Sequence, residues 1–285
     1  MASMRDIKRR KESVQSTQQI TKAMKLVSTV KLQKAKARAE DAKPYFDKMF
    51  ATVTSILEKT EEKDHRYLKE NGSQKCAIIL LTGNRGLAGG YNNNICKEVV
   101  EQGFDPENTL IYGVGRKGIE YMTRKGFVIA KDASDMIDDP VFSDAAALGK
   151  EVLDAYERGE IGKIYLAYTR FKNTVVHTPT LLPLLPVEIT QEQREEAGKE
   201  APMNFEPKAE EALDLIIPKY INSLIYGGFM EAVASENGAR MQAMDSATSN
   251  ADDIIASLSL AYNRARQGAI TQELTEIISG AEAQG

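Results

Sequence analysis

Two glycine-rich segments contain the residue types that can surround a phosphate group. Residues 113–118 read Gly-Val-Gly-Arg-Lys-Gly and match GxGxxG, in which glycines let the backbone approach a dinucleotide pyrophosphate at a helix N-terminus. This pattern follows the second expected strand, however, and Asp132 comes too early to be the acid that binds the ribose. Residues 83–90 follow the first expected strand but lack the Gly-Lys-Ser/Thr ending of a phosphate loop. We therefore predict tight strand-to-helix turns at both segments and no bound cofactor.

The remaining reactive residues do not assemble into a catalytic or metal centre. A short acidic series comprises Asp132, Asp135, Asp138 and Asp139. Its spacing is not that of a calcium loop and no bidentate Glu follows, so a solvated loop is expected. Cys76 and Cys96 form no CxxC pair, which favours two buried reduced thiols over a zinc site. His65 and His177 are isolated in the sequence, so no catalytic residue is predicted.

The first 57 residues have the periodicity of one long helix. Residues 4–57 contain no glycine and only one proline, Pro44, and their apolar residues recur at helical spacing. Ser3 can cap the helix start, and Asp6 can complete a weaker form of the capping box. A bend is expected near Pro44. The apolar stripe is too thin for a helix buried on its own, so the helix needs a partner.

Residues 207–279 supply that partner through a second stripe with the same period. Pro207 fits a first helical turn, and Pro218 lies inside the pattern, where it should kink the helix. Residues 1–40 hold eleven Lys/Arg against three Asp/Glu, whereas residues 229–285 hold three against eight. Opposite charge favours antiparallel pairing of the two helices, although each exposed pair contributes only a few tenths of a kcal/mol.

Between the two helices, the spacing at which apolar residues recur changes from that of a helix to that of a strand. Strands are expected at residues 76–82, 109–113, 127–131 and 163–169, with an extended stretch at 175–187 and helices at 91–102, 116–125 and 143–157. This alternation predicts a small Rossmann-like βαβ domain with a mainly parallel sheet. The predicted fold class is therefore α/β plus coiled coil. Its parts are an N-terminal helix (1–58), an α/β foot domain with border linkers at 58–74 and 190–203 (59–206), and a C-terminal helix (207–285).

Composition excludes several functional classes. The 285 residues are 42% hydrophobic and 27% charged, with a net charge of −4, as in ordinary soluble proteins. The apolar runs are too short to span a bilayer, and no signal peptide precedes the first helix. Residues 8–11 are basic, but no aromatic residues accompany them to stack on bases, so nucleic-acid binding is not expected. Membrane association would come only through partner proteins.

Particular sequence strings resemble the gamma subunit of bacterial F-type ATP synthases. Residues 20–28, Ile-Thr-Lys-Ala-Met-Lys-Leu-Val-Ser, are similar to the N-terminal signature of that family. Residues 262–280 are similar to its C-terminal signature. Shorter strings are similar as well, at residues 223–227, 234–236, 239–241, 243–248 and 84–92. Asn84 departs from the Asp that is common in the family, which weakens any metal or acid role there. The resemblance spans the chain and is loosest in residues 101–203.

The resemblance implies a non-catalytic central-stalk rotor of a proton-translocating enzyme. Ion flow through a c-ring would turn the shaft inside a hexameric ring of alpha and beta subunits, and the shaft would drive the catalytic beta subunits through their conformations for ATP synthesis or hydrolysis. The foot domain would contact the epsilon subunit and the c-ring. The implied location is the cytoplasmic face of the bacterial cell membrane, as a peripheral protein. No cofactor is implied.

The resemblance also implies the rotor residues that face the moving subunits. On the first helix they are Met24 and Lys25, and on the second they are Arg266, Gln267, Thr271 and Glu273. Antiparallel helices with equal rise keep facing residue numbers at a nearly constant sum of about 267, so Met24 should face the neighbourhood of Ala243. The second helix then extends beyond the first, and its apolar tip needs cover from a partner. The tip residues are Leu274, Ile277 and Ile278.

Two other functional classes stay open from the sequence alone. One is a dinucleotide-dependent enzyme that uses residues 113–118. The other is a coiled-coil scaffold or a nucleic-acid-binding arm that uses the basic first helix. Saturation binding with labelled nucleotides would reveal the first class, and a salt-sensitive gel shift with DNA would reveal the second.

Overall fold

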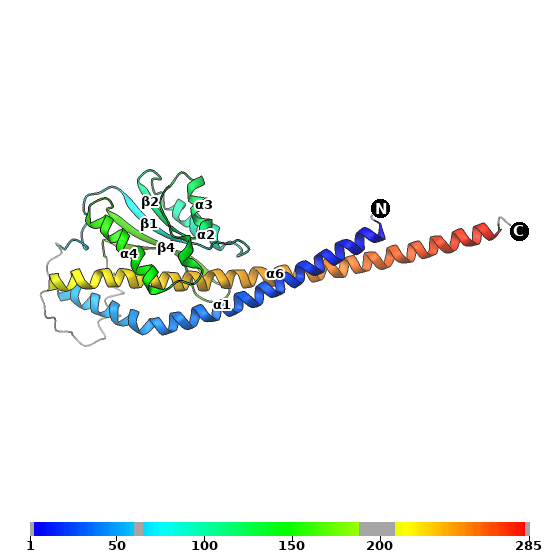
Figure 1. Cartoon of the computed structure of the whole chain (residues 1–285), viewed down its shortest axis with the longest axis horizontal. Coiled ribbons are helices and arrows are strands. Elements are labelled where there is room, and N and C mark those ends of the chain that lie inside the picture. Colours follow the sequence, from blue (N-terminus) through cyan, green and yellow to red (C-terminus); the bar gives the residue numbers. More distant parts are fainter. Residues whose placement is uncertain (1–2, 60–64, 188–208, 283–285) are drawn as a thin grey trace. The chain divides into compact units, whose positions relative to one another are not determined.

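The computed structural model describes residues 3–59, 65–187 and 209–282. These residues divide into two compact units, which are treated separately below. Unit 1 comprises residues 1–28 and 241–285, and unit 2 comprises residues 29–240. The helices α1 (Met4–Lys59) and α6 (Ala209–Glu282) each contribute to both units (Figure 1). The predicted linker at residues 190–203 lies outside the described residues.

Helix α1 begins as the sequence predicts. The backbone N–H of Asp6 donates to Ser3 Oγ at 3.2 Å, and Ser3 Oγ donates to Asp6 Oδ2 at 2.9 Å. Ser3 therefore satisfies one of the free amides at the helix start, and Asp6 supports the cap through the Ser3 hydroxyl. Pro44 and Pro218 both lie inside continuous helices.

Unit 2 is built on a five-stranded sheet in the order β3-β2-β1-β4-β5. The strands are β1 (Cys76–Leu81), β2 (Thr109–Val114), β3 (Val128–Asp132), β4 (Lys163–Phe171) and β5 (His177–Leu185). Strands β1 to β4 pair in parallel, and β5 pairs antiparallel with β4. The connecting helices are α2 (Tyr91–Glu101), α3 (Arg116–Arg124) and α4 (Phe142–Glu157). The predicted α/β class with a mainly parallel sheet and long terminal helices is confirmed.

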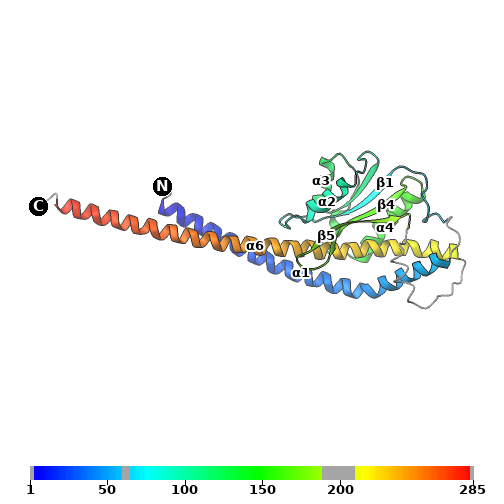
Figure 2. The ribbon, with the colours of Figure 1, turned by 180° about the vertical axis from the view of Figure 1, so that it is seen from behind.

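Successive side chains of a strand point to opposite faces of the sheet, so the apolar residues of β1 contribute to a hydrophobic core on each face. Ile78 and Leu80 of β1 pack with α2 and α3, in a cluster that includes Ile95 and Met122. The alternate residues of β1 pack on the other face with α4, α1 and α6; they are Ala77, Ile79 and Leu81. Figure 2 shows this second face of unit 2 with α4 and α6 alongside it. Both faces of a parallel sheet are thus covered, as its nearly continuous apolar strands require.

The acidic series is more ordered than predicted. A 3₁₀ helix, η1 (Ser134–Ile137), occupies part of the expected solvated loop. Asp132 Oδ1 accepts from the backbone N–H of Ser134 at 2.9 Å. Hydrogen bonding by the side chain and then by the backbone of Ser134 lowers the pKa of that carboxyl. Asp139 pairs with Arg38 at 2.6 Å and with Lys34 at 3.4 Å. The four aspartates are exposed, as a solvated loop requires. The short 3₁₀ helix and the pairing of Asp139 with basic residues of α1 add order that the local sequence does not reveal.

Candidate functional site on the long helices

Three polar contacts define how α1 and α6 pair within unit 1. Thr21 Oγ1 lies 2.7 Å from Thr248 Oγ1, and Lys25 Nζ lies 2.6 Å from Asp245 Oδ1. Gln18 also donates to Asp252. Residue numbers rise along one helix as they fall along the other, so the pair is antiparallel. Met24 consequently lies opposite residues near Asp245, less than one turn from Ala243, and the register prediction is confirmed.

Four of the five described residues buried between the two helices of unit 1 are small or polar, and the fifth is Met244. Among the described residues of this unit they are Thr21, Ser28, Met244, Thr248 and Ala251. Small residues allow the helix axes to approach closely, and the two threonine hydroxyls satisfy one another or the preceding turn. Sequence reasoning identified the stripe but missed the threonine pair, because a buried threonine and an exposed one are alike in a periodicity pattern.

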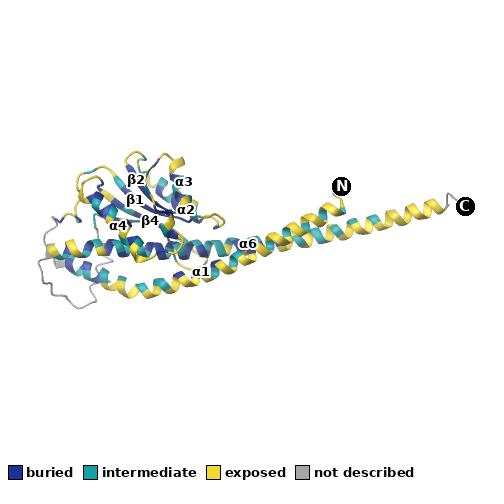
Figure 3. Ribbon diagram, in the orientation of Figure 1, coloured by how far each residue is buried: buried dark blue, intermediate teal, exposed yellow. Residues whose placement is uncertain are grey.

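The predicted rotor residues lie at two levels of exposure. Met24 and Lys25 are half-buried, and Lys25 is engaged by Asp245. Five predicted contact residues further along α6 are exposed: Arg266, Gln267, Thr271, Glu273 and Leu274. Ile277 and Ile278 are 67% and 59% exposed, high values for large apolar side chains near the end of a helix. Figure 3 shows the C-terminal part of α6 as exposed. The α6 segment from residue 271 onward thus presents a continuous exposed surface with an apolar component.

The GxGxxG segment of unit 2 is occupied by protein groups. Thr82 Oγ1 accepts from the N–H of Gly118 at 2.9 Å and donates to the carbonyl of Gly115 at 3.0 Å. The N–H of Arg116 donates to Asn84 Oδ1 at 3.1 Å. Gly115 has φ +120°, and a Cβ there would lie 2.0 Å from the Thr82 carbonyl oxygen. Close packing therefore explains the glycines, and these two amides at the start of α3 already have partners within the chain.

A largely buried ion pair on α6 contacts the other glycine-rich segment. Arg240 Nη2 lies 2.6 Å from Glu236 Oε1, and each side chain is only 12% exposed. Arg240 also donates to the carbonyl of Gly86 at 3.3 Å, and a Cβ on Gly83 would lie 2.5 Å from Glu236 Oε1. The same segment holds Leu87 in the left-handed region, at φ +63°, with 64% of its surface exposed.

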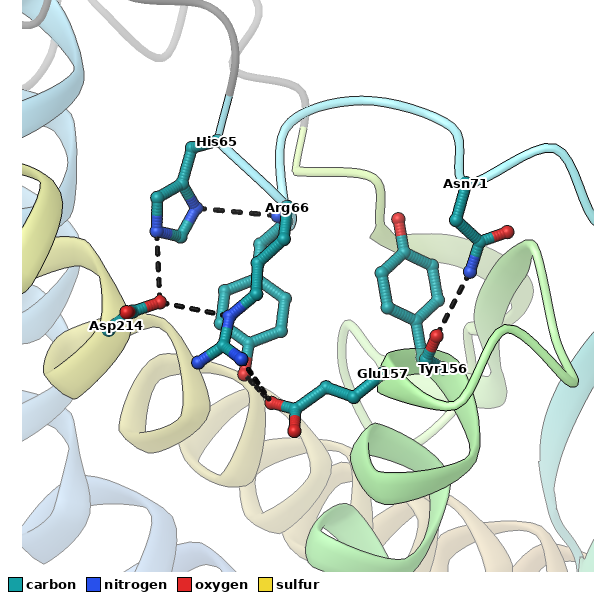
Figure 4. Close-up of polar contacts among 7 residues, drawn as sticks. His65, Arg66, Asn71, Tyr156, Glu157 and Asp214 are labelled. Carbon is teal, nitrogen blue, oxygen red and sulfur yellow. Dashed lines mark hydrogen bonds and ion pairs between the residues drawn. The ribbon is translucent and has the colours of Figure 1, made fainter.

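A polar cluster joins the first turns of α6 to the α/β fold within unit 2 (Figure 4). His65 Nδ1 accepts from the N–H of Tyr67 at 3.3 Å, so its Nε2 carries the hydrogen and donates to Asp214 Oδ1 at 3.0 Å. Arg66 Nε also donates to Asp214, at 2.9 Å, and the Tyr67 hydroxyl donates to Glu157 at the end of α4. Burial is the main cause that raises the pKa of Tyr67 far above its usual value.

Asn71 and Tyr156 extend the same cluster. Asn71 Nδ2 donates to the carbonyls of Tyr156, at 3.0 Å, and Ile161, at 2.8 Å. The Tyr156 hydroxyl donates to the carbonyl of Lys69 at 2.9 Å. The segment before β1 is thereby tied to the end of α4. Sequence reasoning assigned this segment to a linker, because its polar composition does not reveal side-chain partners far along the chain.

Neither a metal centre nor a membrane span is found in the part of the chain that the structure describes. Within it, no three His, Cys, Asp or Glu side chains converge in a metal-binding arrangement. No described helix has an apolar stretch long enough to cross a bilayer. Cys96 is buried, and burial raises the pKa of its thiol to about 12. Cys76 is half-buried rather than buried as predicted, because it is the first residue of β1, at the end of the sheet. Its Sγ lies within hydrogen-bond distance of Thr109 Oγ1.

Comparisons with known proteins identify the family. A family model described as ATP synthase matches residues 3–284. The ATP synthase gamma chain of Lachnoclostridium phytofermentans is 62% identical, with 99% of each chain covered. A sodium-ion-specific ATP synthase gamma chain from Acetobacterium woodii is 39% identical, covering 99% of this chain and 98% of that one.

Solved structures share the fold at lower identity. A chain of the Euglena gracilis mitochondrial ATP synthase matches with a TM-score of 0.70 and 19% identity, covering 99% of this chain and 94% of that one. A chain from the Tetrahymena thermophila mitochondrial ATP synthase central stalk and c-ring matches with a TM-score of 0.57 and 23% identity, covering 80% and 99%. With a family match over nearly the whole length and relatives above 30% identity, the chain belongs to the ATP synthase gamma family.

Proposed function

We propose that this chain is the non-catalytic central-stalk rotor of a bacterial F-type ATP synthase. The observation that carries the proposal is 62% identity with a curated gamma chain across 99% of both chains. The arrangement of unit 1 supports it, because two paired helices with small interfacial residues form a slender rod. The occupied amides of the GxGxxG segment support a role without nucleotide binding by this chain.

The rotor acts by imposing conformations on its neighbours. Alpha and beta subunits form a ring around the shaft, and ion flow through the c-ring turns it. Each angle of an asymmetric shaft stabilises one set of ring conformations, so rotation shifts the beta subunits through their nucleotide-binding states. The α/β fold of unit 2 contacts the epsilon subunit and the c-ring, and the chain reaches the cytoplasmic face of the membrane through these partners.

The contact residues divide into two groups by chemistry. Arg266, Gln267, Thr271 and Glu273 are exposed and polar, which suits hydrogen bonds that form and break as the shaft turns. Leu274, Ile277 and Ile278 form the apolar tip of α6, and each could contribute about 1.5–3 kcal/mol if fully buried by a surrounding collar. Met24 and Lys25 contribute from α1, where Lys25 acts while paired with Asp245.

Co-expression with the alpha and beta subunits of the same organism tests the proposal. The full chain should co-purify with the ring, and the complex should couple ATP synthesis to an ion gradient. A chain that ends after Gly280 retains the whole apolar tip and should support normal coupling. A chain that ends after Glu273 lacks the tip and should couple less efficiently. Failure of the full chain to co-purify with the ring would contradict the rotor assignment. Equal coupling of ATP synthesis by the two truncated chains would show that the apolar tip of α6 is not needed for coupling.

A further inference from the structure

A cavity of about 400 Å³ lies within unit 2 between α1, α6 and the β4–β5 edge of the sheet. Its volume is in the range of pockets that hold small organic ligands. The walls are mainly apolar and include Phe46, Leu182, Leu224 and Met230. Nothing in the function proposed above uses this space.

Small residues of both helices line the cavity. They are Ala42 of α1 and Gly227 and Gly228 of α6. A Cβ on Gly227 would lie 2.9 Å from the Phe46 ring, so glycine at this position lets that ring pack closely against α6. Pro44 removes a backbone hydrogen bond from this part of α1, and Figures 1 and 2 show the light-blue part of α1 curving away from α6.

The Glu231 carboxylate lies beside these apolar walls. Glu231 lines the cavity, and its Oε2 accepts from the backbone N–H of Phe171 at 3.1 Å, which fixes the carboxylate plane. No ion pair to Glu231 occurs among the described residues. Burial raises the pKa of Glu231, against the opposing influence of the Phe171 amide and of Arg170. Glu231 is half-buried, and a partly desolvated carboxylate with incomplete charge compensation is a favourable partner for a cation.

The rim of the cavity carries net negative charge, the same sign as the Glu231 carboxylate. Glu40 and Asp47 border it together with Lys43, and the ammonium of Lys43 is already paired with Asp47 at 2.8 Å. The acidic groups thus outnumber the basic ones around an apolar interior. This combination complements a ligand that has an apolar body and one positive charge.

We propose that this cavity binds a small organic amine, whose ammonium group pairs with the Glu231 carboxylate and whose apolar body contacts Phe46, Leu182 and Met230. The inference is independent of the rotor function, because it depends only on contacts within unit 2. Since α1 and α6 form opposite walls, a bound amine joins the two helices. Binding should therefore raise the thermal stability of the chain by mass action.

Titration calorimetry on the full chain with 4-phenylbutylamine tests the proposal, and 4-phenylbutanol serves as the neutral probe of similar shape. The amine should bind saturably and at least about ten-fold more tightly than the alcohol, or about 1.4 kcal/mol. Glu231→Gln should abolish this preference. Glu107→Gln, which removes an exposed acid elsewhere in unit 2, should leave it unchanged.

A second variant distinguishes the contribution of the cavity's shape to binding from the contribution of the Glu231 charge. Ala42→Phe narrows the cavity without touching Glu231, so it should weaken binding of both probes while circular dichroism shows a folded chain. If Glu231→Gln does not fold, the Ala42→Phe comparison decides the question. Equal binding of amine and alcohol, an amine affinity unchanged by both variants, or no saturable heat with either probe would each overturn the proposal.

Discussion

The same two helices bury different kinds of side chain in the two units. In unit 2, α6 contributes large apolar residues to the core: Leu213, Ile217, Ile221, Ile225 and Phe229. In unit 1 it buries only Met244, Thr248 and Ala251 among the described residues. Each large side chain that is fully buried contributes about 1.5–3 kcal/mol, whereas alanine and threonine contribute much less. Unit 2 therefore has a hydrophobic core of its own, and unit 1 depends on close backbone approach and polar contacts.

This difference bears on the proposed function. Unit 1 leaves large apolar side chains exposed, including Leu260, Ile270 and Leu274. A paired helix with such a surface and few internal contacts gains from a partner that covers it. A rotor shaft that turns inside a ring requires a surface that contacts changing partners. Unit 2 must instead hold its shape while torque passes through it, and its large core suits that role.

The largest expected effect comes from the core of unit 2. Phe229→Ala removes a side chain with no exposed surface and should destabilise the chain by about 3–5 kcal/mol, because a cavity remains. Ile254→Ala in unit 1 is the matched control on the same helix, since Ile254 is 44% exposed, and should cost less than about 1 kcal/mol. Urea unfolding measures both. Similar losses would mean that the two units do not differ in their dependence on apolar burial.

A smaller effect is expected at the Glu236–Arg240 pair. Arg240→Met leaves the Glu236 carboxylate largely buried without its partner and should cost about 2 kcal/mol. Lys150→Met is the control, because Lys150 and Asp154 form an exposed pair at the same helical spacing and should contribute less than about 0.5 kcal/mol. Denaturant unfolding of the two variants gives the comparison. A loss at Arg240 no larger than at Lys150 would show that solvent screens the Glu236 pair.

Sequence periodicity predicted most of the fold for a physical reason. Helices and strands repeat over several residues, so the apolar patterns of α1, α6 and β1 identify each element without knowledge of the rest. The register of α1 against α6 also followed, because both helices rise equally per residue. Rotor residues such as Arg266 and Gln267 were predicted from sequence similarity to the family, and not from the spacing of apolar residues.

Contacts between distant segments could not be predicted in this way. The partner of Asp139 is Arg38, about a hundred positions away, and the cluster around His65 joins three separate segments. The roles of Glu236 and Arg240 depend on the loop that packs on them. Such contacts depend on tertiary placement, which a single sequence pattern does not encode.

The threonine pair of unit 1 should contribute modestly. The Oγ1 atoms of Thr21 and Thr248 lie 2.7 Å apart, and both residues are buried. Replacing one threonine by valine therefore leaves the other hydroxyl without its cross-helix partner. The Thr21→Val and Thr248→Val double-mutant cycle should give a coupling of about 1 kcal/mol. Hydrogen exchange of the backbone amides near residues 21 and 248 measures the loss of stability in this part of unit 1. Additive losses in the two single variants would show that the hydroxyls are not coupled.

The smallest effect is a pH dependence in unit 2. His177 Nε2 is buried without a hydrogen-bond partner among the described residues, and Gly238 packs so closely that a Cβ there would lie 2.7 Å from it. The Phe171 ring packs on the imidazole, and the ammonium of Lys36 lies 4.9 Å from the centroid of that ring. Burial lowers the pKa of His177 below its usual value of 6.5. The neutral imidazole is therefore the form that the folded chain accommodates.

The sign of the effect follows from the proton count. Below pH 6.5 the unfolded chain binds a proton at His177 that the folded chain does not, so stability falls as the pH drops from 6.5 toward the lower folded pKa. Glu231 acts in the opposite direction, because its raised pKa makes the folded chain more stable as the pH falls. Urea unfolding of the wild type and of His177→Gln between pH 7.5 and 5.5 isolates the histidine, since Glu231 is present in both. The stability of the wild type relative to the variant should decline on acidification, and a constant or rising difference would show that the imidazole is protonated equally in both states.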